Sequence, residues 1–119
     1  MKHTINVLGT NYSIEKRDYN ECEEFEKYNW AGFCEEYNKR IVVGNIKTFP
    51  DMANESEKVC AKVEKHNLRH EIIHAFLNES GLSSCSMHHD AWAKNEEMVD
   101  WLAIQLPKIY QVFKALDLL

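Results

Sequence analysis

The 119-residue sequence predicts a single α+β domain, on the strength of two observations. Short segments in which apolar and polar residues alternate fill the first 50 positions, which is typical of a small antiparallel sheet. From about residue 54 onward, apolar residues recur at three- and four-residue spacing, which is typical of helices. We therefore expect a small antiparallel β-sheet packed on helices that follow it. A chain of this length holds one hydrophobic core, so residues 1–119 are expected to form one domain.

Two hairpins are expected in the sheet region. Residues 5–7 and 12–14 alternate on either side of Gly9-Thr10-Asn11, which is good turn chemistry. Residues 32–35 and 40–43 alternate around a polar turn centred on Asn38. The segment Cys22–Asn29 between the hairpins is expected to form one irregular helical turn or a loop.

A long helix is expected from about Asn54 to Ser80. Asn54 and Glu57 fit an N-cap with its reciprocal partner three residues later. Gly81 suits the left-handed position that follows a helix end. The pattern leaves open whether this helix is continuous or broken near Asn67.

A further helix is expected after a polar loop. Asp90 is placed to cap a helix that runs to about Leu106. Pro107 then kinks the chain or opens a last helix through Leu119, because proline is tolerated in the first turn of a helix but not in its interior.

Charge and composition exclude several classes of function. The formal net charge is -5 and no cluster of Lys and Arg is present, so we expect no nucleic-acid partner, because phosphate binding needs a basic surface. No apolar run reaches the length of a signal peptide or of a membrane span, so a cytoplasmic protein without a membrane partner is expected. The four cysteines lack a C-x-x-C pair and are expected to be reduced thiols. Three tryptophans are expected to anchor the core: Trp30, Trp92 and Trp101.

The segment His70-Glu71-Ile72-Ile73-His74 carries the strongest functional signal, the pattern HExxH. Residues four apart on a helix lie one turn apart on the same face, so His70 and His74 would place two imidazoles close enough to bind one metal ion. Glu71 lies about 100° round the helix, where its carboxylate would reach a water on the metal. The pattern predicts a zinc site in which Glu71 is the catalytic general base.

The two histidines share their side of the helix with apolar residues, which indicates a face turned toward the core. The residues on this stripe are Val59, Val63, His66, His70, Ile73, His74 and Leu77. Ile72 and Phe76 project from nearly the opposite side, so the helix is expected to be sandwiched within the domain. His66 lies about 12 Å along the axis from His74, too far to share one ion, and is expected to be either second shell or merely packed.

A third ligand is required, because catalytic zinc takes three protein ligands and a water. Glu96 and Asp100 stand four residues apart on one stripe of the later helix. We expect Glu96 to complete the ligand set and Asp100 to accept a hydrogen bond from His70. Glu97 is the alternative to Glu96, but it lies about 100° off the stripe and is expected to be solvated.

Stabilisation of a developing oxyanion needs a hydrogen-bond donor close to the metal. His88 and His89, in the loop before the Glu96 helix, are candidates for this role, although a solvated loop histidine is the plainer interpretation. Tyr37 or Tyr110 could act in the same way, and the sequence does not choose among them.

With HExxH at 70–74 and Asn95-Glu96-x-x-x-Asp100 about twenty residues later, the chain resembles the gluzincins, the thermolysin-like zinc metallopeptidases. The resemblance implies the same ligands and general base as those named above, and the same carboxylate, Asp100, as the hydrogen-bond partner of His70. Over roughly residues 32–107 the chain is more similar to the small ImmA/IrrE-type metallopeptidases of bacteria, phages and mobile elements. Those proteins more often carry Asn at the position of Asp100 and usually Gly at that of Ile73.

The resemblance predicts zinc-dependent hydrolysis of a peptide or protein substrate by a minimal zincin-like domain, with Zn²⁺ as the cofactor. The alternative is a non-enzymatic zinc-binding module that regulates or binds a partner protein. A metal-free structural protein is a third possibility. The three differ in whether zinc binds and whether Glu71 is needed for turnover, and the oligomeric state is left open.

Overall fold

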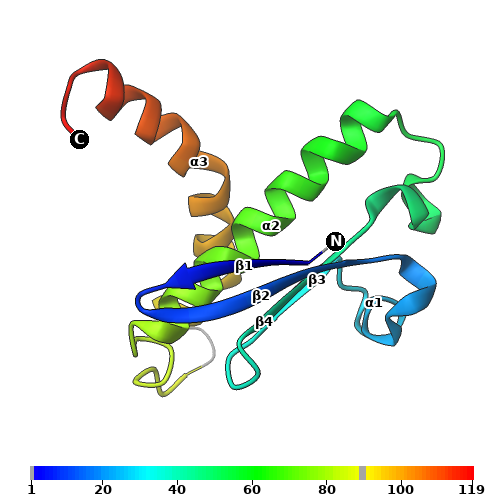
Figure 1. Cartoon of the computed structure of the whole chain (residues 1–119), viewed down its shortest axis with the longest axis horizontal. Helices are drawn as coiled ribbons and strands as arrows, with labels where there is room; N and C mark the ends of the chain where they lie inside the picture. Colours follow the sequence, from blue (N-terminus) through cyan, green and yellow to red (C-terminus); the bar gives the residue numbers. More distant parts are fainter. Residues whose placement is uncertain (1, 89–90) are drawn as a thin grey trace.

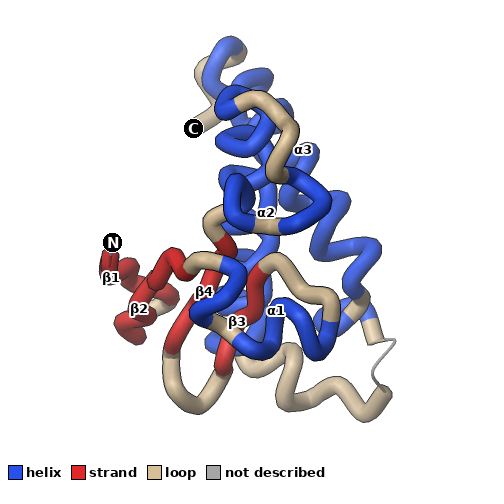
Figure 2. Tube along the Cα trace, turned by 90° about the vertical axis from the view of Figure 1, so that its right-hand side faces the viewer, coloured by secondary structure: helices blue, strands red, loops and turns tan. Residues whose placement is uncertain are grey.

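The computed structural model describes residues 2–88 and 91–119 and confirms the α+β class. Four strands form one sheet: β1 (Lys2–Val7), β2 (Thr10–Arg17), β3 (Gly32–Glu35) and β4 (Arg40–Gly44). Three α-helices accompany it: α1 (Glu23–Tyr28), α2 (Glu57–Glu79) and α3 (Glu96–Ala115). Helix α2 crosses the sheet and α3 diverges from it in a V (Figure 1), so that α2 lies between the sheet and α3 (Figure 2).

The sheet is mixed rather than wholly antiparallel, which corrects the prediction. Its strand order is β1-β2-β4-β3, and the two expected antiparallel hairpins are joined by a parallel pairing of β2 with β4. Alternation in a sequence identifies the two faces of a strand but not its neighbour, so this pairing could not be predicted. The order places β3 at the edge of the sheet that lies beside α2.

The first hairpin turns one residue earlier than predicted. Leu8 and Gly9 both have positive φ, 51° and 94°, and β2 already begins at Thr10. Two consecutive residues with positive φ are what a two-residue type I′ turn requires. Leu8 therefore adopts a conformation that its sequence neighbours do not indicate.

Helix α2 is continuous through Asn67, which answers the question left open by the sequence. Its N-cap is Ser56 rather than Asn54, because the Ser56 hydroxyl accepts a hydrogen bond from the Val59 backbone N–H at 3.2 Å. Gly81, with φ of +84°, follows the end of the helix in the expected left-handed conformation.

Helix α3 begins later than predicted, at Glu96. The Asn95 side chain caps it by accepting from the Met98 N–H at 2.9 Å. The predicted cap, Asp90, lies outside the described residues. Pro107 does not open a separate helix, since α3 runs through it to Ala115.

The main core lies between the sheet and α2. Its buried residues are Val7, Tyr12, Ile14, Ile41, Val43 and Ala75. On the other side of α2, Leu77 and Ile73 pack with Val99 of α3 and with Ala93. Helix α2 is therefore packed on two sides, but the prediction holds only in part: Ile72 packs on the sheet side, whereas Phe76 and Val59 are exposed.

The tryptophan prediction is wrong. Trp30, Trp92 and Trp101 are each about half exposed, whereas Phe25 and Tyr12 are the large rings that are fully buried. All four cysteines are unpaired. Among the described residues, no helix combines the length and apolarity needed to cross a bilayer.

Candidate metal centre

His70 and His74 of α2 and Glu96 at the start of α3 form a compact cluster. The two histidine Nε2 atoms are 3.1 Å apart, and Glu96 Oε2 lies 2.9 Å from His70 Nε2 and 3.3 Å from His74 Nε2. Ligand atoms bound to a tetrahedral zinc at about 2.0–2.1 Å are about 3.3 Å from one another. Within the described part of the chain, this is the one group of three or more such side chains that could hold a metal ion.

The helix holds the two imidazoles side by side and largely buried. His70 and His74 follow one another by one turn, and their side chains are 16% and 17% exposed. Burial lowers the pKa of His74 below its usual value, which the negative charge of Glu96 partly offsets. A neutral imidazole keeps a lone pair for a metal.

Asp100 lies one turn after Glu96 and contacts two histidines of α2. Its Oδ1 is 3.1 Å from His70 Nδ1 and 2.6 Å from His66 Nε2. When His70 Nδ1–H donates to this oxygen, Nε2 keeps a free lone pair, which a metal lying between His70, His74 and Glu96 would use. The hydrogen bond from His66, together with that from His70, lowers the pKa of Asp100. The structure thus pairs Asp100 with His70, as predicted, and places His66 behind it as a second donor.

Glu71 is one of two buried polar residues in the described chain, with 8% of its surface exposed. Burial raises its pKa to about 7, the negative charge of Glu96 adds to the increase, and His70 opposes it. Gly32 on β3 lies directly against this side chain, since a Cβ at residue 32 would stand 3.4 Å from Glu71 Cγ, in ordinary van der Waals contact. The edge strand therefore covers Glu71 on the side of the sheet.

The cluster and Glu71 open on a cavity of about 660 Å³. One wall comes from the segment Asn29–Cys34 and from Glu36, and the other from α2 and α3. The sequence did not reveal the first wall, because β3 comes beside α2 only through the strand order. A glycine inside a predicted strand, Gly32, was the one available signal of a close approach.

Cys34 is a second residue that the sequence did not connect with the site. Its thiol accepts a weak hydrogen bond from Asn78 Nδ2 at 3.8 Å. Burial, reinforced by the charge of Glu71, raises the pKa of Cys34 to about 12. The thiol is therefore protonated at neutral pH and lies outside the ligand cluster.

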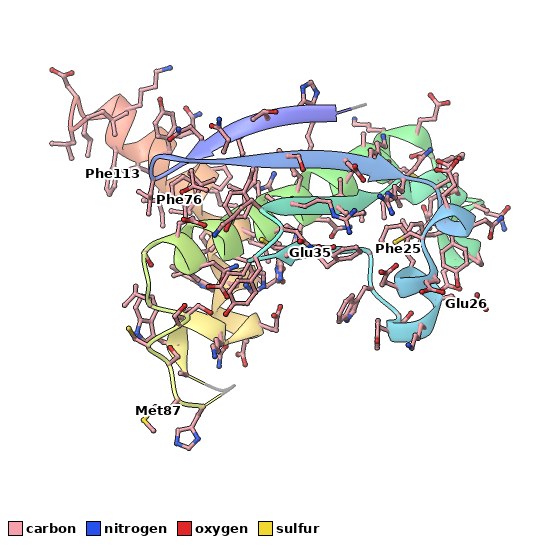
Figure 3. The ribbon with its side chains drawn as sticks, turned by 60° about the horizontal axis from the view of Figure 1, so that its bottom comes forward. Phe25, Glu26, Glu35, Phe76, Met87 and Phe113 are labelled. Atoms are coloured by element: carbon pink, nitrogen blue, oxygen red, sulfur yellow. The ribbon has the colours of Figure 1, made fainter. Side chains whose placement is uncertain are left out.

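The residues predicted to stabilise an oxyanion do not line the cavity, as far as the structure describes them. His88 is exposed and is not among the residues that line the cavity; it follows Met87, whose side chain projects from the loop (Figure 3). His89 lies outside the described residues. Tyr37 is 91% exposed, and Tyr110 lines a separate apolar groove between α2 and α3. An oxyanion-stabilising role for any of them stays a prediction, and the exposed Glu97 does not join the cluster.

Comparison with protein-family models, curated proteins and solved structures finds no match for this chain. The resemblance to gluzincins therefore depends on the motif residues and their arrangement alone.

Proposed function

We propose that this chain is a zinc-dependent metallopeptidase. The observation that carries the proposal is the position of a buried carboxylate, Glu71, beside a His70, His74 and Glu96 cluster that opens on a cavity. Two histidines, one glutamate and an accessible fourth position are the arrangement of a catalytic rather than a structural zinc site.

Each residue has a distinct part in this proposal. His70, His74 and Glu96 would hold the zinc, which when bound would supply a Lewis acid that activates water. Glu71, whose carboxylate is buried beside the cluster, would accept a proton from the attacking water and return it to the leaving amine. Asp100 holds His70 in the tautomer whose Nε2 faces the cluster.

The test is Glu71→Gln, which keeps the size of the side chain and removes its basicity. The variant should bind zinc as the wild type does and should lose about a hundredfold to ten-thousandfold in turnover. Zinc content, measured by elemental analysis, and cleavage of a peptide library are the two readouts. Glu97→Gln, an exposed change on the neighbouring helix, is the matched control and should leave both unchanged. Equal cleavage by purified Glu71→Gln and wild type would contradict the mechanism.

A second candidate is a zinc-binding module that binds a partner protein without cleaving it. One observation favours it: the C-terminal part of α3 and the residue that follows it expose several large apolar side chains, Tyr110, Val112, Phe113 and Leu116. Wild-type protein that binds zinc stoichiometrically but cleaves no member of the library would support this candidate over the peptidase.

A further inference from the structure

Arg69 directly precedes the motif, and its side chain crosses from α2 to the backbone of α3. Its Nε–H donates a hydrogen bond of 2.6 Å to the carbonyl oxygen of Ala103. Ala103 is fully buried where the two helices meet, three residues after Asp100 and seven after Glu96. This hydrogen bond therefore joins α2 to α3 within two helical turns of both Glu96 and Asp100.

The acceptor in this contact is free for a reason that lies in the sequence. In an α-helix the carbonyl of residue 103 accepts from the N–H of residue 107. Residue 107 is a proline inside α3 and has no N–H. A buried carbonyl without a donor is costly, and Arg69 supplies the donor from the other helix.

The contact matters because few side chains hold α3 against α2. Val99 and Ala103 are the buried residues of α3, Asp100 accepts hydrogen bonds from His66 and His70, and every residue from Tyr110 to Leu119 is exposed. Apolar packing of two small side chains tolerates sliding and rotation, whereas a directed hydrogen bond to one carbonyl does not. Glu96, with 71% of its side chain exposed, has no packing of its own to hold it opposite the histidines.

We propose that Arg69 acts as a register lock: it binds the Ala103 carbonyl, which Pro107 leaves without its helical donor, and so sets the position of Glu96 and Asp100 against His70 and His74. Arg69 is a positioning residue in this proposal and touches neither metal nor substrate. The inference rests on the proposed zinc site, and it adds that the affinity of the site depends on a contact that lies outside the cavity.

The experiment compares two replacements of Arg69, Gln and Met, whose side chains have nearly the same size and shape as each other. Arg69→Gln keeps an N–H donor at the position of Nε without the charge, and Arg69→Met puts a methyl group there. Zinc dissociation constants are measured by chelator competition, and unfolding of the zinc-free protein is measured in urea. We expect Arg69→Met to bind zinc about tenfold more weakly, as expected when a group that orients metal ligands is lost, and Arg69→Gln to stay within about twofold of the wild type.

A second pair of variants separates positioning from simple stabilisation. In Pro107→Ala the new N–H can pair with the Ala103 carbonyl, which has a second lone pair for Arg69, so zinc binding should be unchanged. In the double variant Arg69→Met/Pro107→Ala, the N–H of residue 107 pairs with the Ala103 carbonyl, but the hydrogen bond from residue 69 that joins α2 to α3 is absent. Stability of the zinc-free double variant should therefore recover, while its zinc affinity should stay about tenfold weak.

Three results would overturn the lock and leave the peptidase proposal intact: Arg69→Met that binds zinc as tightly as wild type, Arg69→Gln that fails as Arg69→Met does, or a double variant that recovers affinity together with stability. Wild-type protein that binds no zinc would instead overturn the proposed function itself, and with it the lock.

Discussion

The two helices that build the candidate centre contribute to it in different ways. Helix α2 packs on the sheet through Leu68, Ile72 and Ala75, and the histidines that it carries are largely buried. Helix α3 packs mainly on α2, and Glu96 and Asp100 are 71% and 43% exposed. The histidine half is therefore preorganised by the fold, whereas the carboxylate half depends on one interface between helices.

This contrast predicts unequal losses when one ligand is removed from each half. A complete zinc ligand set binds with about 10–16 kcal/mol, so a buried imidazole accounts for about a thousandfold in affinity. His74→Ala should lose that much. Glu96→Ala should lose only about tenfold to a hundredfold, because water can reach an exposed position and take its place.

Zinc dissociation constants from chelator competition test this inequality. Glu97→Ala removes an exposed carboxylate one residue from Glu96 and should bind zinc as wild type does. Equal losses for His74→Ala and Glu96→Ala would show that the two halves are equally preorganised, and the comparison would fail.

Burial of Glu71 on α2 disfavours its charged form, so it should lower the stability of the zinc-free protein at neutral pH. Its pKa is raised from 4.5 to about 7, so between these values the folded chain holds a proton that the unfolded chain has released. Stability of the zinc-free protein should therefore fall as pH rises from about 4.5 to about 7 and change no further above that. The full effect is about 3 kcal/mol.

Glu71→Gln should remove this dependence and be more stable than wild type at pH 8, as measured by urea unfolding at several pH values. His74, whose pKa is lowered, makes stability rise with pH in the same range, so the quantity to follow is the difference between wild type and variant. A constant difference from pH 5 to pH 8 would contradict the raised pKa.

The same contrast explains how much of the molecule the sequence could predict. Both hairpins and the long helix depend on local periodicity, which is visible in one segment at a time. The pairing of Asp100 with His70 joins two helices and was predicted from the tendency of metal-bound histidines to donate to a carboxylate. The parallel pairing of β2 with β4, and hence the wall of the cavity at Asn29–Cys34, depends on contacts between distant segments. The N-cap of α2 is Ser56, two residues after the predicted Asn54. Both side chains are good N-caps, so residue type alone does not decide where the helix begins.

The tryptophans were misplaced for a related reason. A large ring is usually buried, but Trp30 stands in the cavity wall, stacked on Tyr28 with ring centroids 4.6 Å apart, and keeps 45% of its surface exposed. Burial follows from where the segment lies, which composition does not specify.

The smallest expected effect concerns His66, which reaches the carboxylate half from α2. Asp100→Ala removes the acceptor for both His66 and His70 and should weaken zinc binding about tenfold to a hundredfold. His66→Phe leaves the bond from His70 in place and removes one of two donors to the same oxygen, so it should cost only about threefold.

If His66→Phe weakened zinc as much as Asp100→Ala does, Asp100 would be held by His66 rather than by α3 itself. The combined variant distinguishes the two cases, because a donor that acts only through Asp100 has nothing left to do once Asp100 is gone. His66→Phe/Asp100→Ala should then bind zinc as Asp100→Ala does, which is the signature of two coupled residues. Independent, additive losses would mean that His66 contributes to the centre by a route other than this carboxylate.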